Sequence, residues 1–224
     1  LSHTMNTRRD QKTLILSDSH GRGLKDQLFN KNNQECVKGL SRRDIEVVSM
    51  PGCNTEEMLQ YLYDNYGSHD AEREHANTQA YKCIILHVGC CDIAYKDRRA
   101  PKQNQKTIVQ RIDRIISRLY QWFPFATIVF SDIYPQKTPL KWINDITRYV
   151  NRQVCKHIQE RYAAHEVTYV RHSQTFREGG IIQEKFYIMD GRYPGLHLST
   201  EGKKAAAMQL AEVINDVYVC GHRR

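Results

Sequence analysis

Ser19 and His197 are the two residues of this sequence whose types and placing suit nucleophilic chemistry. Ser19 follows an apolar run, 14–16, and comes just before a glycine-containing stretch that ends at Gly23. This pattern is typical of a buried strand that ends in a tight turn, with a helix beginning near Gly23. A serine in such a turn lies at the carboxyl edge of a sheet, where α/β proteins bind their ligands. We therefore expect Ser19 to be a nucleophile, with the amino end of the helix facing the oxyanion that its attack creates.

His197 is the candidate general base. An imidazole can take the proton from a serine hydroxyl as it attacks an ester carbonyl, and then return that proton to the leaving alcohol. The expected oxyanion donors are the backbone N–H groups of Ser19 and Gly52, since glycine lets the backbone approach a substrate closely. Both types also have ordinary uses, because a histidine can cap a helix or face solvent and a glycine can simply form a turn.

Strands that alternate with helices are expected to bring these residues together. The apolar patterns predict strands at 14–16, 45–49, 83–88, 125–130 and 167–170, and helices at 24–28, 54–66, 108–119, 140–158 and 200–217. The charged stretch 67–78 and the basic stretch 96–106 are expected to be surface loops. This order predicts an α/β fold: a three-layer α/β/α domain around a five-stranded parallel sheet with strand order 2-1-3-4-5.

One domain is expected, because the sequence shows no internal repeat, low-complexity linker or second core. Residues 1–12 are expected to be a cloning remnant and a basic leader, 13–219 the domain, and 220–224 a basic tail. No apolar run approaches the roughly 18 residues that cross a bilayer. The start also lacks the apolar region of a signal peptide. We therefore expect an intracellular protein, cytoplasmic or, as part of a ribonucleoprotein, nuclear.

The seven cysteines are an odd and scattered set, which is typical of free thiols in a reducing compartment. Cys90, Cys91 and His87 lie close together in the sequence. However, no second pair of ligands at zinc-finger or zinc-ribbon spacing accompanies them. We therefore expect neither a metal site nor a cofactor.

The formal net charge of +8 favours polyanionic partners such as RNA, DNA or an anionic membrane surface. Tyr95 could stack on a base within a phosphate-binding rim near the site. Seven basic residues are the candidates for that rim: Arg22, Lys25, Lys96, Arg98, Arg99, Lys102 and Lys106. The alternative is that these cations are the ordinary solvated side chains of helix faces and loops.

Four sequence blocks resemble the SGNH/GDSL hydrolase superfamily, over essentially the whole chain. They are Ser17-Asp18-Ser19, Pro51-Gly52, Gly89-Cys90-Cys91-Asp92, and His197-Leu198-Ser199 with Gly202. The residues of these blocks are most similar to those of the esterase domain encoded by the first open reading frame of CR1/L2-type LINE retrotransposons. The resemblance implies a flavodoxin-like fold, an acyl or acetyl ester as substrate, Ser19 as nucleophile, Gly52 as oxyanion donor and His197 as base. The retrotransposon relatives further imply nucleic-acid binding and self-association.

Two positions depart from the family pattern. The family's asparagine, an oxyanion donor, is replaced by Cys91, whose thiol donates hydrogen bonds weakly. Losing one such donor costs other serine hydrolases roughly 3–4 kcal/mol of transition-state stabilisation. The family's acid three residues before the histidine is replaced by Pro194, so Asp190 would reach His197 only if the loop folds back. Two alternatives stay open: an esterase with a Ser–His pair and an impaired oxyanion hole, or a degenerate module that binds RNA or DNA.

Overall fold

The structure is a computed structural model and describes residues 12–30, 36–67, 81–94, 101–191 and 194–220. Five strands form one parallel sheet in the order β2-β1-β3-β4-β5, which confirms the predicted topology. The strands are β1 (Lys12–Ser17), β2 (Ile45–Ser49), β3 (Tyr81–His87), β4 (Thr127–Ser131) and β5 (Val167–Val170). The register places Ser17, the last residue of β1, beside both Ser49 and His87. The carboxyl ends of β1, β2 and β3 therefore lie level with one another.

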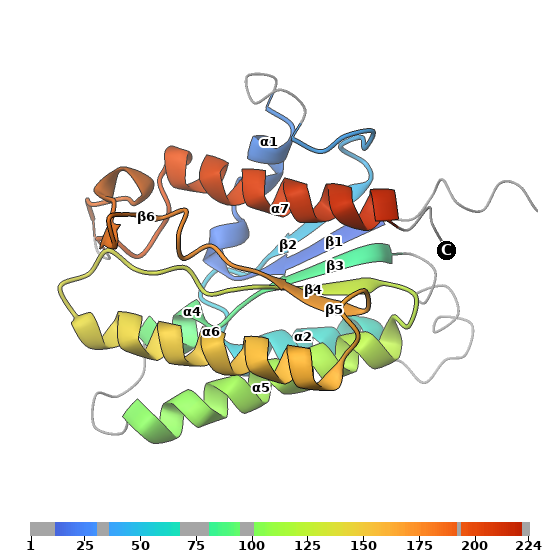
Figure 1. Cartoon of the computed structure of the whole chain (residues 1–224), viewed down its shortest axis with the longest axis horizontal. Coiled ribbons are helices and arrows are strands. Elements are labelled where there is room, and N and C mark those ends of the chain that lie inside the picture. Colours follow the sequence, from blue (N-terminus) through green and yellow to red (C-terminus); the bar gives the residue numbers. More distant parts are fainter. Residues whose placement is uncertain (1–11, 31–35, 68–80, 95–100, 192–193, 221–224) are drawn as a thin grey trace, which may run out of the picture.

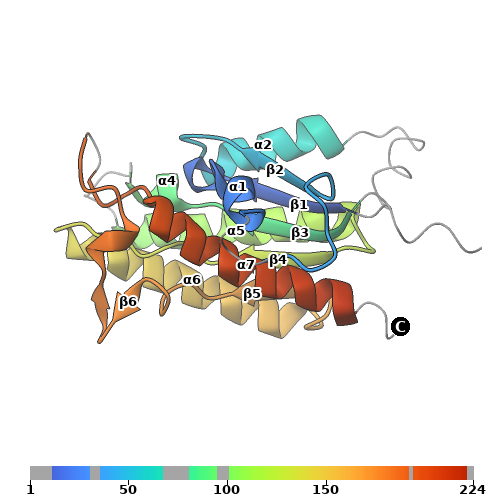
Figure 2. The same ribbon diagram turned by 90° about the horizontal axis from the view of Figure 1, so that it is seen from above.

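Helices cover both faces of the sheet, as Figures 1 and 2 show. One face carries α1 (Leu24–Leu28) and α7 (Thr200–Cys220), and the other carries α2 (Thr55–Tyr66), α5 (Pro101–Trp122) and α6 (Lys141–Arg161). The shorter elements are the 3-10 turns η1 (Ser19–Gly21) and η3 (Glu184–Phe186), the helix α4 (Cys90–Ala94), and the hairpin of β6 (Arg177–Glu178) and β7 (Ile181–Ile182). Within the described residues, no helix is long and apolar enough to span a bilayer.

The strands read as continuous apolar runs because both faces of the sheet are covered. Alternate side chains of a strand point to opposite faces. Leu14 and Leu16 accordingly lie in the core beneath α2, α5 and α6, while Ile15 lies in the core beneath α1 and α7. Ala207 and Ala211 of α7 are buried in that second core, where their small side chains let the helix approach the sheet closely.

The predicted starts of helix α5 and strand β4 are wrong. Helix α5 begins at Pro101, so residues 101–106 are helical and not part of a loop. These residues carry no apolar periodicity that would reveal a helix, although a proline fits a first helical turn. Strand β4 begins at Thr127, and Phe125, which was expected to start it, is 70% exposed. The predicted loop beyond Gly67 lies outside the described residues.

The start of α2 is fixed by reciprocal hydrogen bonds between Asn54 and the first turn of the helix. Asn54 Oδ1 accepts from the backbone N–H groups of Glu56 and Glu57, at 2.9 and 3.0 Å. In return the Glu57 carboxylate accepts from the Asn54 N–H at 2.9 Å. Such a reciprocal capping box satisfies donors that the helix end leaves unpaired. It also anchors the chain immediately after Gly52, which holds that residue at the carboxyl edge of the sheet.

Candidate active site

A cavity of about 430 Å³ opens at the carboxyl edge of the sheet. Ser19, Gly52, Cys91 and His197 all line it, although they come from four separate segments of the chain. Each of the first three follows the end of a different parallel strand, β1, β2 or β3. The edge of a parallel sheet at its carboxyl ends is where α/β proteins place their ligands.

Ser19 and His197 approach one another across the cavity. Ser19 Oγ lies 3.5 Å from His197 Nδ1, and both residues are half-buried. This distance is longer than an ordinary O–H···N hydrogen bond. Catalytic contacts of this kind commonly tighten when a substrate binds. The two groups are thus placed for transfer of a proton from the hydroxyl to the imidazole.

The loop that carries His197 is held by pairing of its backbone. The N–H of Ile188 donates to the carbonyl of His197 and the N–H of Gly195 donates to the carbonyl of Ile188, both at 2.8 Å. Gly195 has a φ of +75°, and a Cβ there would lie 1.6 Å from the carbonyl oxygen of Lys137. Only glycine fits this position, because it has no Cβ. This close packing against Lys137 fixes the course of the backbone two residues before His197.

Gly52 lies in a tight turn between β2 and α2. The N–H of Cys53 donates to the carbonyl of Met50 at 3.0 Å, and Gly52 has a φ of +81°. A turn with positive φ at its third residue calls for glycine. A Cβ at Gly52 would find open space, since nothing lies within 4 Å of its position. The requirement for glycine here comes from the backbone conformation, and the space beside it remains open to a substrate.

Cys91 and Asp92 begin α4 and have different environments. Burial raises the pKa of the Cys91 thiol to about 12, and the nearby charge of Asp18 adds to this effect. Cys91 therefore stays protonated and can offer only a weak S–H donor. Asp92 is fully buried and accepts two hydrogen bonds of 2.8 Å from Thr55, one from its N–H and one from its hydroxyl. Asp92 thus ties α4 to the start of α2.

His20 is a residue of this site that the sequence analysis missed. Its Nδ1–H donates to Asp18 Oδ1 at 2.9 Å, and its Nε2–H donates to the carbonyl oxygen of Leu196 at 3.1 Å. Both partners are acceptors only, so both ring nitrogens carry a hydrogen and the ring is an imidazolium. His20 thereby joins the turn of Ser19 to the residue before His197. The sequence feature that could have revealed this role of His20 is its position two residues after Asp18 in a tight turn.

The charges of Asp18 and His20 stabilise one another in a fully buried position. Burial opposes the charge on each group, but their mutual attraction and their hydrogen bond outweigh it. As a result the pKa of His20 is raised and the pKa of Asp18 is lowered. Removing one partner of a buried pair leaves the other uncompensated, which typically costs about 3–5 kcal/mol.

A second polar group lies behind the cavity. Ser131 Oγ lies 3.1 Å from His87 Nδ1 and 2.9 Å from His172 Nε2. Burial lowers the pKa of His87 to about 4 and that of His172 to about 3, so both rings are neutral. His172 Nδ1–H donates to Gln209 Oε1, so its Nε2 accepts from the Ser131 hydroxyl. Ser131 in turn accepts from His87, whose ring stacks on Tyr134 with 4.1 Å between ring centroids.

Ser131, Asp132 and His172 have the residue types of a hydrolase triad but not its exposure. Ser131 and His172 are fully buried, so a substrate does not reach the hydroxyl. Asp132 accepts from the backbone N–H of His172 at 2.9 Å and not from its ring. We therefore assign these residues to the polar core of the protein.

The protonation states of the buried histidines give a first prediction. At pH 6.5, the ordinary histidine pKa, we expect a doubly protonated His20 beside neutral His87 and His172. The pKa of His20 lies above that pH because of Asp18, whereas burial places the other two below it. Imidazole nitrogen chemical shifts measure this directly, with His20→Gln to assign the charged ring. A His87 or His172 ring that titrates near pH 6.5 would contradict the proposed hydrogen-bond pattern.

Asp190, the predicted third member of the site, is exposed. The pKa of His197 is lowered, first by burial and then by the charge of His20, while the Asp18 carboxylate acts in the opposite direction. Among the described residues, Asp18 is thus a carboxylate whose charge acts on His197. A triad role for Asp190 stays a prediction.

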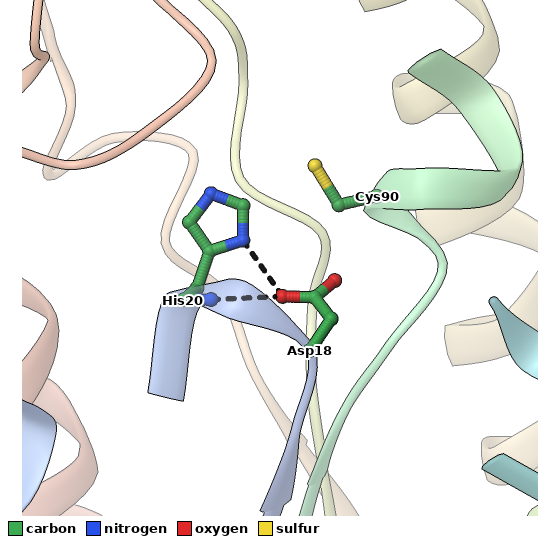
Figure 3. Close-up of side chains that lie close together, drawn as sticks. All are labelled: Asp18, His20 and Cys90. Atoms are coloured by element: carbon green, nitrogen blue, oxygen red, sulfur yellow. Dashed lines mark hydrogen bonds and ion pairs between the residues drawn. The ribbon is translucent and has the colours of Figure 1, made fainter. Parts of the chain in front are cut away.

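Asp18, His20 and Cys90 place three ligand atoms within 4.8 Å of one another, as Figure 3 shows for their side chains. A carboxylate, an imidazole and a thiolate are all ligands that zinc accepts. However, the Asp18 and His20 atoms already bond to each other. Burial also raises the pKa of the Cys90 thiol well above its ordinary value. A metal ion would have to displace protons from two of the three groups, so we assign them to the ion pair and its surroundings.

The predicted basic rim is described only in part. Arg22 lines the cavity, Lys25 is half-buried on α1, and Lys106 is exposed on α5. The remaining candidates fall outside the described residues or, for the last, have an undescribed side chain: Tyr95, Lys96, Arg98, Arg99 and Lys102.

Comparison with known proteins identifies the fold. No protein-family model and no curated protein matches the sequence. The lipase Lip_vut3 from a goat rumen metagenome is similar in structure, with a TM-score of 0.64 and 13% identity over 90% of this chain and 96% of that one. A member of the lipolytic protein G-D-S-L family from Veillonella parvula gives 0.59 and 18% identity, over 91% and 97%. The chain has the SGNH/GDSL hydrolase fold.

A mutant acetyl esterase solved with an acetate ion is also similar, with a TM-score of 0.60 and 13% identity over 94% of this chain and 99% of that one. At these identities the similarity concerns the fold. The SGNH part of the predicted resemblance is thereby confirmed. These lipases and esterases give no support to an origin in a retrotransposon or to an association with nucleic acid.

Proposed function

We propose that this chain is a serine esterase that hydrolyses a small acyl or acetyl ester, with Ser19 as nucleophile and His197 as general base. The observation that carries the proposal is the approach of Ser19 Oγ to His197 Nδ1, at 3.5 Å on the wall of an open cavity. The fold is shared with proteins described as a lipase and an acetyl esterase, which supports ester hydrolysis as the reaction.

The reaction follows from the placing of these groups. Ser19 Oγ attacks the ester carbonyl carbon while His197 Nδ1 takes its proton. The oxyanion accepts hydrogen bonds from the N–H groups of Ser19 and Gly52 and a weak one from the Cys91 thiol. Collapse of the intermediate expels the alcohol, which takes the proton from His197 and leaves an acyl group on Ser19. Water, deprotonated by His197, then attacks that acyl group and releases the acid and the free serine.

The surroundings of His197 suit it to the role of base. Burial lowers its pKa, and the positive charge of His20 lowers it further. The ring is therefore neutral at neutral pH. A neutral imidazole can accept a proton, whereas an imidazolium cannot. The hydrogen bond from His20 to the carbonyl of Leu196 also fixes the backbone next to His197.

Covalent labelling tests the assignment of the nucleophile. A fluorophosphonate is expected to phosphonylate Ser19, because the probe reacts with a serine only when a base activates the hydroxyl. Peptide mapping by mass spectrometry locates the modified residue. His197→Ala is expected to abolish labelling without removing Ser19. Labelling at another serine, or labelling of Ser19 that survives in His197→Ala, would show that the pair does not act together.

Binding of RNA or DNA, the alternative predicted from the net charge, is left out of this proposal. The named structural neighbours are lipases and esterases, and most of the candidate rim residues lack a described side chain. Arg22, the member of the predicted rim that lines the cavity, bears instead on the choice of ester.

A further inference from the structure

We propose that the ester cleaved at this site carries an anionic group, a carboxylate or a phosphate, close to the scissile bond. This inference rests on the proposed function and describes the substrate class of the same site.

Two cationic side chains, Arg22 and Lys203, line the cavity together with Ser19 and His197. Arg22 ends the turn η1 that begins at Ser19, and Lys203 lies in the first turn of α7. A Cβ on Gly23, next to Arg22, would lie 3.8 Å from Lys203 Nζ. The two cations therefore border the same corner of the cavity, although they lie far apart in the sequence.

Among the described residues, neither cation has a partner that an incoming anion would have to replace. Within the described part of the chain, no carboxylate lies at ion-pair distance from Arg22 or Lys203, and neither side chain forms a hydrogen bond. Lys137, in contrast, pairs with Glu184 at 3.2 Å. Hydrogen bonds between a cation and an anion are about twice as strong as neutral ones. Two such donors facing a cavity therefore favour a negatively charged ligand.

Among the described residues that line the cavity, none is acidic. Asp18 lies beneath it, fully buried, and its charge is matched by His20. The charges of Glu57 and Asp92 act on the Cys91 thiol. The corner beside His197 is thus positive, because both Arg22 and Lys203 also act on the His197 ring. An anionic group on the substrate would lie there.

Apolar side chains also line the cavity. They are those of Pro51, Ile188, Leu196 and Leu198. A cavity lined by both cations and apolar side chains suits a small ester with an apolar part and one charged end. A charge fixed next to the reacting bond also orients the ester, which lowers the entropic part of the barrier.

Three matched phenyl acetates test the inference. They carry at the para position a carboxylate (para-acetoxybenzoate), a phosphate (para-acetoxyphenyl phosphate) or the neutral methyl ester of the first compound. The measured quantity is kcat/KM for each anionic ester divided by that for the neutral one, at about pH 8, where His197 is neutral in every variant. The larger of the two ratios assigns the anion as carboxylate or phosphate.

Lys203→Gln is expected to lower that ratio about tenfold, the loss that accompanies one charged hydrogen bond. Arg22→Gln is expected to lower it less, because its exposed charge is screened by salt. Lys204→Gln is the matched control, since Lys204 is the next residue of α7 and is exposed away from the cavity lining. A ratio that falls equally in Lys204→Gln, or that does not fall in Lys203→Gln, overturns the inference.

Binding to the Ser19→Ala protein separates this inference from the proposed function. Para-hydroxybenzoate, the anionic product, is expected to bind about tenfold more tightly than its neutral methyl ester, as measured by titration calorimetry. If the wild-type protein cleaves no ester but this preference is found, the proposed function is wrong and the anionic site stands. If the protein cleaves the neutral ester equally well and shows no preference, the function stands and the anionic site is wrong.

Discussion

Ser19→Ala is expected to lower kcat/KM for para-nitrophenyl acetate about 10⁴-fold or more, to the rate measured in buffer alone. Without the hydroxyl no acyl intermediate forms, and the N–H groups of residue 19 and Gly52 can then only polarise the carbonyl toward attack by water. Steady-state release of nitrophenol measures the effect. Circular dichroism checks that the variant is folded, which is expected because Ser19 is half-buried and its side-chain contact in the described structure is the approach to His197.

Ser131→Ala is the matched control, because Ser131 also contacts a histidine, at 2.9 Å. It is fully buried, so its replacement removes hydrogen bonds from the core and is expected to cost about 1–3 kcal/mol of stability. Its effect on kcat/KM is expected to stay within about tenfold, since the hydroxyl does not meet the substrate. If Ser131→Ala were folded but inactive while Ser19→Ala kept its activity, the catalytic serine and histidine would be Ser131 and His172.

The topology was predictable because each of its signals is local. The runs 14–16 and 83–86 are apolar at every position and so on both faces, which indicates strands buried between two helical layers. Parallel strands then bring Ser19, Gly52 and Cys91 to one edge whatever the details of the loops. The start of α5 was not predictable in this way, because residues 102–106 are all polar and show no apolar periodicity.

The buried polar groups escaped prediction because their partners are distant in sequence. His20 bonds to the carbonyl of Leu196, 176 positions away, and His172 to Ser131, 41 positions away. Nothing in a single sequence shows that such histidines are buried, and buried polar groups are stable only where a partner is present. The sequence also does not reveal which way Lys203 and Lys204 point, which decides the charge of the cavity.

Cys91→Asn is expected to raise kcat/KM for the same ester about 10²-fold. Cys91 lines the cavity with Ser19 and Gly52, and burial raises its thiol pKa to about 12, so it offers the oxyanion only a weak S–H donor. An asparagine amide is a much better donor, and one such donor contributes about 10²–10³ to the rate in another serine hydrolase. The gain is expected in kcat more than in KM, because the oxyanion exists only in the transition state and intermediate.

Cys91→Asp gives the sharpest comparison, because aspartate has nearly the same shape as asparagine but carries a negative charge. It is expected to lower kcat below that of the wild-type protein, since a carboxylate repels the developing oxyanion. Cys91→Ala, which removes only the thiol, is expected to change kcat less than about threefold, as a weak donor contributes little. Thermal unfolding of all three variants separates a loss of fold from a change in chemistry. Equal effects of asparagine and aspartate would mean that residue 91 acts by its size, and that the oxyanion is held by the two backbone N–H groups alone.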